Sequence, residues 1–540
     1  MSQPDREGQT SPLKRALVAI EKLQARLDAV ERAKREPIAI VGMSCRFPGG
    51  ANSPEAFWAL LREGRDVVRE VPPDRWDIDA YYDPDPDAPG KMASRWGAFL
   101  DDVAHFDAGL FGITPRECEG LDPQQRLLLE LAWEAFEDAG IAPDGLSGSR
   151  TGVFVGIANT DYKQLALANG HLDWLGAYYG SGTAPSMGSG RLSYFFGLQG
   201  PSISVDTACS SSLVAVHLAV KALRAGECRM ALAGGVNLML APETTIALSK
   251  YRMLAPDGRC KTFDAGANGF VRGEGGALVV LKRLSDAVAD GDRILAVIRG
   301  SAVNQDGPSS GLTAPNGPSQ EAVIREALAD GGVEPHEVAY VEAHGTGTSL
   351  GDPIEVQALG AVLGEGRPKE RPVLIGSVKT NMGHLESAAG IAGLVKAVLA
   401  VRYGEIPAHL HFREPNPYIP WERLPVRVVT ERERWPEGAE RIAGVSSFGF
   451  SGTNAHVVVA AAPAAEPGER SGGEVDRPVH VLVVSGREER ALREYAGRYA
   501  ERLGEGEEEL SLADVAHTAN TGRAQFGHRA AVVAETVEEA

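Results

Sequence analysis

The feature that most constrains the fold is a long alternation of strand-like and helix-like stretches. From Pro37 an apolar run, PIAIVGMSCRFPGG, opens about 400 residues in which short apolar runs alternate with helical patterns. The buried strands are predicted at residues 151–156, 230–235, 276–282, 294–303, 338–342, 373–377 and 455–460. The helices are predicted to include residues 123–139, 210–225, 318–329 and 387–402. This pattern predicts an α/β fold over residues 36–460.

The segment before this region, residues 1–35, carries a different repeat. Apolar residues recur there with spacings of three and four, at Leu13, Ala16, Ile20, Leu23, Leu27 and Val30. That spacing is typical of a coiled coil, and in this register Arg26 and Glu31 fall where a parallel partner chain would pair them. Because about three heptads form a marginal helix when isolated, we expect pairing or docking. A single exposed helix, or a tail folded back on the body, is the alternative.

The residues after the α/β region divide into a linker and a small second unit. Residues 461–477 are rich in Ala, Pro, Gly and Glu, a composition typical of a linker. Residues 478–540 predict a strand at 480–485, helices at 488–503 and 510–520, and a final strand in AAVVAE. This α/β unit is too short for a large core, and we interpret it as part of a longer polypeptide.

Charge and cysteine usage exclude several classes of function. The 73 acidic residues outnumber the 54 basic ones, and a formal charge of -19 argues against nucleic acid or an anionic membrane as the partner. The first residues, MSQPDREGQTSPLKR, lack the apolar core expected of a signal peptide, and no stretch reaches the roughly 18 apolar residues that cross a membrane. Its five cysteines form neither a CxxC pair nor a zinc-binding spacing. We therefore expect a cytoplasmic protein without a metal site.

The strongest chemical signal lies in SVDTACSSSLVAVHLAVKALRAGE. A short strand ending near Val205 turns through Asp206 and Thr207 into an apolar helix that is predicted to begin at about Cys209. A thiol in the first helical turn lies near unpaired N–H groups and the positive end of the helix dipole, which favour the thiolate and lower its pKa. This indicates a nucleophile. A structural cysteine in a buried helix is the alternative.

Two histidine segments favour the nucleophile. His344 follows a strand in YVEAHGTGTSLGDPIE, on a loop of small and hydroxyl residues, and Lys379 and His384 follow another strand in IGSVKTNMGHLESAAG. Either histidine alone would more often be structural, and His217, inside the apolar helix, is interpreted that way. One cysteine, two histidines and a lysine together suit a cysteine that attacks a thioester and imidazoles that donate hydrogen bonds to a developing enolate.

Other motifs narrow the choice of chemistry. The turn SSFGFSGTNAHVVV enters a strand and could supply a backbone N–H donor to an oxyanion. HGTGTSLG contains a GxG but lacks the dinucleotide-binding spacing, and no acidic residue follows in the expected place. Nicotinamide binding is therefore disfavoured.

At these residues the sequence resembles the ketosynthase domain of modular type I polyketide synthases. The resemblance runs in order through EPIAIVGMSCRFPGG, LDPQQRLLLE, DTACSSSL, DGRCKTFD, GFVRGEGG, HGTGTSLGDPIE, KTNMGHLESAAG and FGFSGTNAHVV. It implies a thiolase-like fold, in which two related β/α halves form a layered sandwich, and a homodimer. It also implies decarboxylative condensation of an acyl chain with a malonyl-type extender, giving a β-ketoacyl carrier protein.

The resemblance assigns roles to individual residues. Cys209 becomes the acyl-accepting nucleophile, His344 and His384 the catalytic pair, and Lys379 the supporting lysine. The oxyanion hole would use the backbone N–H groups of Cys209 and Phe450. The remaining assigned residues, which would bind the phosphopantetheine arm of an acyl carrier protein, are Thr346 and Thr348. No cofactor is expected to be bound by this region itself, because substrates would arrive on that arm.

The resemblance also extends to the segments on either side of the α/β region, and it implies which partners the chain binds. The first 35 residues resemble a docking coiled coil that receives chains from an upstream synthase subunit. Residues 478–540 resemble part of the linker domain that precedes an acyltransferase. The expected partners are upstream and same-module acyl carrier proteins, the upstream subunit and the acyltransferase domain, with no nucleic acid and no membrane.

Departures from the family pattern define the competing interpretations. Ser451 replaces a glycine of the commoner GFGGTN turn, and we expect the turn to tolerate this change. A thiolase-like enzyme acting on coenzyme A would use a second cysteine as base and would lack the paired histidines. An inactive structural ketosynthase would have lost Cys209 or His344, and both are present.

Overall fold

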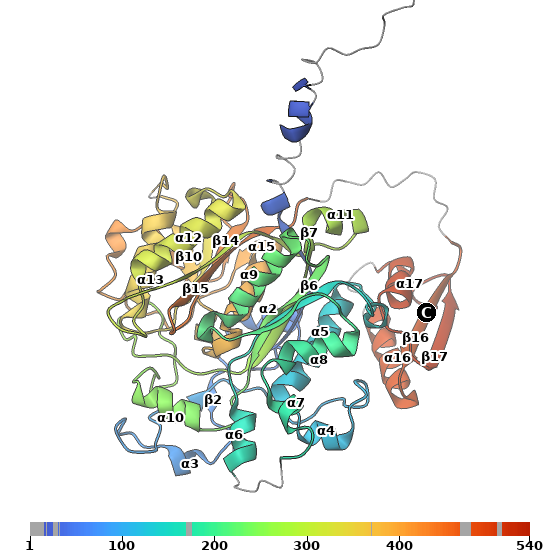
Figure 1. Cartoon of the computed structure of the whole chain (residues 1–540), viewed down its shortest axis with the longest axis horizontal. Helices are drawn as coiled ribbons and strands as arrows, with labels where there is room; N and C mark the ends of the chain where they lie inside the picture. Colours follow the sequence, from blue (N-terminus) through green and yellow to red (C-terminus); the bar gives the residue numbers. More distant parts are fainter. Residues whose placement is uncertain are drawn as a thin grey trace, which may run out of the picture.

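The computed structural model describes residues 16–17, 19–24, 31, 33–168, 175–368, 370–464, 477–504 and 510–540. Within these residues the largest sheet has eleven strands in the order β12-β10-β9-β14-β15-β8-β1-β7-β6-β4-β5 (Figure 1). The strands are β1 (Ile38–Arg46), β4 (Thr151–Gly156), β5 (Ser202–Val205), β6 (Met230–Asn237), β7 (Gly275–Arg283), β8 (Ala296–Gln305), β9 (Tyr340–Glu342), β10 (Val373–Gly376), β12 (Val426–Val428), β14 (Ile442–Phe448) and β15 (Thr453–Ala461).

The sheet consists of two halves with the same pattern. In β1-β7-β6-β4-β5 the first two pairings are antiparallel and the last two parallel. The half β8-β15-β14-β9-β10 repeats that sequence of pairings, and β12 adds one more parallel strand. A short antiparallel pairing of residues 38–40 with 296–298 joins the halves. The two related halves expected from the sequence are confirmed.

Helices form layers around these halves (Figure 1). α9 (Ser211–Arg224) follows β5 and α15 (Ala389–Tyr403) follows β10, and the two helices contact each other and strands of both halves. Because each is covered on nearly all sides, each is apolar on most faces. The outer helices α5 (Pro123–Asp138) and α8 (Met187–Phe196) pack on the first half, and α12 (Gly317–Gly331) and α13 (Gly351–Leu363) on the second.

Shorter elements complete the body. The helices are α2 (Pro54–Arg62), α3 (Ile78–Tyr81), α4 (Pro115–Glu119), α6 (Asp161–Ala168), α7 (Tyr179–Thr183), α10 (Glu243–Lys250), α11 (Leu284–Asp290) and α14 (Lys379–Met382). The strands are β2 (Arg69–Glu70), β3 (Trp96–Gly97), β11 (Glu405–Ile406) and β13 (Glu433–Arg434). The 3-10 turns are η1 (Pro143–Gly145), η3 (Ala208–Ser210), η4 (Pro335–Glu337), η5 (Glu386–Ala388) and η6 (Trp421–Arg423).

The C-terminal residues form the predicted small α/β unit. Strands β16 (His480–Gly486) and β17 (His528–Ala534) pair antiparallel, and α16 (Glu489–Gly504) and α17 (Leu512–Thr521) contact them. The unit lies against the first half of the body. There the rings of Trp133 and Phe526 stack with centroids 6.0 Å apart, and Arg523 donates a hydrogen bond of 2.9 Å to the carbonyl of Glu137.

The predicted N-terminal coiled coil is described only in part. Ala16, Ile20 and Leu23 are helical, and the side chains of Ile20 and Leu23 are 62% and 64% exposed. Leu13, Leu27 and Val30 lie outside the described residues, as does most of the predicted linker at 461–477. Pairing with a second chain therefore stays a prediction. Among the helices that the structure describes, none is both long and apolar enough to span a bilayer.

Candidate active site

Cys209 lies where the first half of the sheet meets the central helix layer. After β5 the chain turns through η3, which holds Cys209, and α9 begins at Ser211. The α-helix thus starts two residues later than predicted. Ala208, the residue before the cysteine, has a φ of 56°, which L-amino acids with a side chain rarely adopt.

Hydrogen bonds hold this strained turn in place. The hydroxyl of Ser211 accepts from the N–H of Thr207 at 2.9 Å and donates to the carbonyl of Ala208 at 2.6 Å. The hydroxyl of Ser447 donates to the carbonyl of Cys209 at 2.7 Å. Contacts from both halves of the molecule therefore fix the backbone at Cys209, a residue of intermediate exposure.

His344 lies on the loop after β9. A carboxylate that the sequence did not single out fixes this loop: Glu355 of α13 accepts from the N–H of His344 at 2.7 Å and from that of Gly345 at 2.8 Å. Asp352, one turn earlier, accepts from the N–H of Gly347 at 3.1 Å. The ring Nδ1 of His344 is buried and has no hydrogen-bond partner among the described residues.

His384 follows α14, and its ring has a defined tautomer. The N–H of Glu386 donates to Nδ1 of His384 at 2.9 Å. Because Nδ1 accepts this bond, the proton of the neutral ring lies on Nε2. His384 can therefore donate a hydrogen bond through Nε2.

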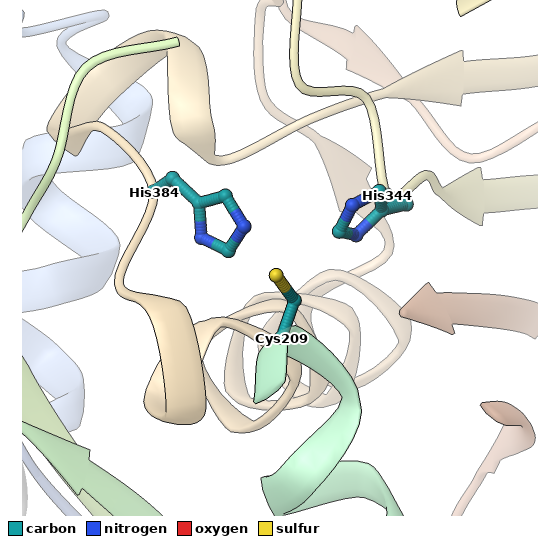
Figure 2. Close-up of side chains that lie close together, drawn as sticks. All are labelled: Cys209, His344 and His384. Carbon is teal, nitrogen blue, oxygen red and sulfur yellow. The ribbon is translucent and has the colours of Figure 1, made fainter. Parts of the chain in front are cut away.

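These side chains converge although they come from three distant segments. The sulfur of Cys209 and one ring nitrogen each of His344 and His384 lie within 4.8 Å of one another. Figure 2 shows the sulfur directed between the two imidazoles, whose centroids are 5.6 Å apart and whose planes are nearly perpendicular, at 84°. All three residues line a cavity of about 370 Å³, which Thr346, Thr348 and Phe450 also line.

Lys379 interacts electrostatically with Cys209 and with both histidines. Its side chain is buried at the start of α14. Burial lowers the pKa of its ammonium group, while the nearby carboxylates of Glu342 and Glu355 raise it. Its positive charge adds to the effect of burial in lowering the pKa of both histidines, and it partly offsets the rise that burial causes in the pKa of Cys209. All four sequence-predicted catalytic side chains thus belong to one interacting group.

The pKa of the Cys209 thiol differs from the value that the sequence predicts. Burial raises the pKa of the Cys209 thiol to about 11, although the N–H groups of Phe450 and Cys209 and the charge of Lys379 lower it. The predicted lowering of the thiol pKa is therefore wrong, because loss of solvation outweighs the N–H donors at the helix start. Burial lowers the pKa of both imidazoles well below 6.5, so both are neutral at pH 7.

The turn carrying Phe450 completes the surroundings of the sulfur. Gly449 approaches the nucleophile turn so closely that an added Cβ would lie 2.3 Å from the carbonyl oxygen of Thr207. Ser451 is absent from the residues with positive φ, so this position does not require glycine. The hydroxyls of Thr346 and Thr348 lie 3.2 Å apart.

A cysteine and two histidines this close also form a donor set of the kind that binds zinc. Coordination through Nε2 of His384 would require the ring proton on Nδ1, where the N–H of Glu386 already donates. The geometry therefore favours hydrogen-bond and proton-transfer chemistry over metal binding.

Comparison with known proteins identifies the family. Residues 35–287 match the N-terminal domain of beta-ketoacyl synthases, residues 295–413 the C-terminal domain, and residues 415–533 the ketoacyl-synthetase C-terminal extension. Polyketide synthase GfsB of Streptomyces halstedii is 54% identical over 94% of this chain and 9% of its own length. The phenolphthiocerol synthesis polyketide synthase type I Pks15/1 of Mycobacterium marinum is 50% identical over 96% of this chain and 25% of its own. The chain thus spans less than a third of these relatives.

Comparison with solved structures indicates the same family. The oxazolomycin ketosynthase domain of Streptomyces albus JA3453 is 42% identical with a TM-score of 0.86, covering 93% of this chain and 87% of that one. A ketosynthase from module 6 of the bacillaene synthase of Bacillus subtilis 168 is 40% identical with a TM-score of 0.82, covering 93% and 83%. The chain belongs to the beta-ketoacyl synthase family and contains a ketosynthase domain of the polyketide synthase type, with its C-terminal extension.

Proposed function

We propose that this ketosynthase accepts an acyl chain on Cys209 from an upstream acyl carrier protein and condenses it with a malonyl-type extender on a second carrier protein. The observation that carries the proposal is the convergence of the Cys209 sulfur with His344 and His384 at one cavity. Thr346 and Thr348, which line the same cavity, would bind the phosphopantetheine arm that brings both substrates. The arm is part of the substrate, and this region would need no cofactor of its own.

In the first step the sulfur of Cys209 attacks the thioester carbonyl of the incoming acyl group. The N–H groups of Cys209 and Phe450 would stabilise the oxyanion, and the C–S bond to the carrier then breaks. The thiol proton of Cys209 ends on the departing carrier thiol, so the exchange is proton-neutral. With a pKa of about 11 the thiol is protonated at pH 7, so its attack must be coupled to removal of this proton.

In the second step the extender loses its carboxylate as carbon dioxide. The electron pair of the broken C–C bond passes to the α-carbon as an enolate, which attacks the acyl carbonyl on Cys209. A new C–C bond forms, the C–S bond to Cys209 breaks, and the thiolate that leaves takes up a proton from solvent. The Nε2–H of His384 would donate to the enolate oxygen, with His344 as the second imidazole donor and Lys379 keeping both rings neutral.

A thiolase-like reaction on coenzyme A is less well supported. Such an enzyme needs a second cysteine as base, and besides Cys209 the cysteine whose charge interacts with Lys379 is Cys260. Its sulfur is buried, accepts the N–H of Val271 at 3.2 Å, and has its pKa raised to about 12 by burial. Cys260 is therefore unsuited to take a proton from substrate.

A homodimer would form through the free edge of the sheet. β5 is the terminal strand of the described sheet, and Ile203 on it is 41% exposed. The adjacent helix α8 presents Tyr194, whose side chain is 88% exposed. Because an open edge with apolar side chains favours pairing with another strand, we infer that β5 pairs with its copy. Equilibrium sedimentation should give a dimer that Ile203→Lys weakens, and a monomeric wild-type protein would contradict this.

The flanking segments would connect this domain to other parts of a synthase. We propose that residues 1–35 dock an upstream subunit, that 36–460 form the catalytic unit, and that 461–477 link it to residues 478–540. This last unit would face a downstream acyltransferase domain. Assigning residues up to 460 to the catalytic unit is supported by β14 and β15, which pair within its sheet.

Acylation of the whole chain tests the proposed nucleophile. Wild-type protein and Cys209→Ala are incubated with an acyl thioester, and the modified residue is located by peptide mass spectrometry. We expect one acyl group on Cys209 of the wild type and none on the variant. Acylation that persists at another residue of Cys209→Ala would contradict the assignment.

A further inference from the structure

A buried arginine contacts the His384 segment through both its backbone and its side chain. The N–H of His384 donates to the carbonyl of Val271 at 2.6 Å, and the N–H of Gly273 donates to the carbonyl of His384 at 2.8 Å. Arg272, between them, is 2% exposed. Two strand-like bonds therefore hold the histidine backbone against residues 271–273.

The side chain of Arg272 reaches the residue that sets the histidine tautomer. Its Nε and Nη2 donate to the two carboxylate oxygens of Glu386, the second bond at 3.1 Å, and its Nη1 donates to the hydroxyl of Thr245 at 2.6 Å. Such a two-pronged arrangement fixes direction as well as charge. The guanidinium therefore holds the carboxylate of Glu386 in a single orientation.

Glu386 has a backbone that needs this support. Its φ is 48°, in the left-handed region that residues with a side chain rarely adopt, and in this conformation its N–H donates to Nδ1 of His384 at 2.9 Å. Because Glu386 begins η5, which leads directly into the buried helix α15, relaxing its φ to a negative value would rotate the preceding peptide unit. The N–H in that unit would turn away from Nδ1, and either ring nitrogen could then carry the proton. The ion pair and the tautomer are therefore coupled through one strained residue.

We propose that Arg272 and Glu386 are positioning residues that keep His384 as an Nε2–H donor, and that they serve the condensation step and not acylation of Cys209. The inference rests on the proposed function, in which the imidazoles act on the enolate and the backbone N–H groups act on the acyl oxyanion. Neither residue is among those that line the cavity at Cys209. They act on the reaction through His384.

The charges around the pair are consistent with this role. Asp161 and Glu274 also stabilise the positive charge of Arg272, so Arg272 stays charged although buried. Arg272 and Lys379 both disfavour a protonated His384. Glu386 in turn raises the pKa of Cys209, so loss of its charge has a predictable effect on the thiol.

The experiment compares two rates in the full chain. Glu386→Gln removes the charge and one strong acceptor, and Arg272→Lys keeps the positive charge but replaces the two-pronged guanidinium. Arg224→Lys is the matched control, because Arg224 forms a buried ion pair of 2.7 Å with Asp330 at the far end of α9. Acylation of Cys209 by an acyl thioester and carbon dioxide release from malonyl carrier protein are measured for each protein.

We expect carbon dioxide release to fall at least tenfold in Glu386→Gln and Arg272→Lys, with acylation within threefold of wild type. Glu386→Gln should also be alkylated faster by iodoacetamide at pH 9, because a charge that raises the thiol pKa is gone. If Glu386→Gln does not fold, Arg272→Lys should show the same separation of rates.

Equal losses of both rates, or losses no larger than in Arg224→Lys, would overturn the proposal. A wild-type protein that is acylated but never condenses would overturn the proposed function instead.

Discussion

Substituting Gly449 by alanine tests the role of a backbone N–H that side-chain mutation cannot reach. The added Cβ would lie 2.3 Å from the carbonyl oxygen of Thr207 and 3.0 Å from the hydroxyl of Ser210. To restore an ordinary contact the turn must move by about 1 Å. Phe450 is the next residue, and its N–H is one of the two that stabilise a negative charge at Cys209.

A displacement of this size has a predictable catalytic effect. Misplacing a catalytic group by about 1 Å, or losing one oxyanion donor, costs about 100-fold in rate, or about 2.7 kcal/mol in barrier height. We therefore expect Gly449→Ala to acylate Cys209 about 100-fold more slowly than wild type, measured by time-resolved intact-protein mass spectrometry.

Ser451→Gly, in the same turn, is the matched control, because that position has no positive φ and its side chain is exposed. It should stay within threefold of wild type. Wild-type acylation by a folded Gly449→Ala would refute the role given to Phe450.

Three further predictions follow from protonation states and from the flanks. Alkylation of Cys209 by iodoacetamide should rise about tenfold per pH unit from pH 8 to pH 10, because thiolate increases in that proportion below a pKa of about 11; a plateau near pH 7 would contradict the raised pKa. Condensation, followed by carbon dioxide release, should not decline between pH 7 and pH 6, because imidazoles with a lowered pKa stay neutral as pH falls through 6.5; a midpoint near 6.5 would show unshifted histidines. Deleting residues 1–35 should leave condensation on supplied carrier proteins unchanged and weaken transfer from a separate upstream subunit, and equal transfer by both forms would argue against docking there.

The regular elements could be predicted because local patterns determine them. Residues 151–156 were expected as a strand and form β4, and α5 and α15 end close to their predicted limits. These segments are apolar and buried, so periodicity and turn residues mark them clearly. In the described sheet, the strand pairing that joins the two halves involves residues 38–40 and 296–298. No periodic pattern in the sequence predicts this pairing.

The candidate site was predicted as a set of residues but not as an electrostatic environment. Motifs named Cys209, His344, Lys379 and His384, and the structure brings all four together. The sign of the Cys209 pKa shift was missed, because burial depends on helices far away in sequence. Glu355 was missed as well, although its spacing from Asp352 on one helix face in GDPIE is a usable signal.

Arg272 and Glu386 were also missed, for a different reason. Both stand in the quoted motifs GFVRGEGG and NMGHLESAAG, but their contact joins segments separated by 114 residues. Only the left-handed backbone at Glu386 shows why the pair is needed, and sequence patterns do not predict such a conformation for glutamate.

The most direct test of the central claim is the fate of an acyl group already bound to Cys209. Acylated wild-type protein is freed of excess thioester and mixed with malonyl carrier protein, and the masses of both proteins are followed together. The account predicts that the enzyme loses the acyl mass while the carrier loses carbon dioxide and gains that acyl group as a β-ketoacyl product, in equal amounts. Hydrolysis of the acyl group, or its return to a carrier without loss of carbon dioxide, would contradict decarboxylative condensation at this site.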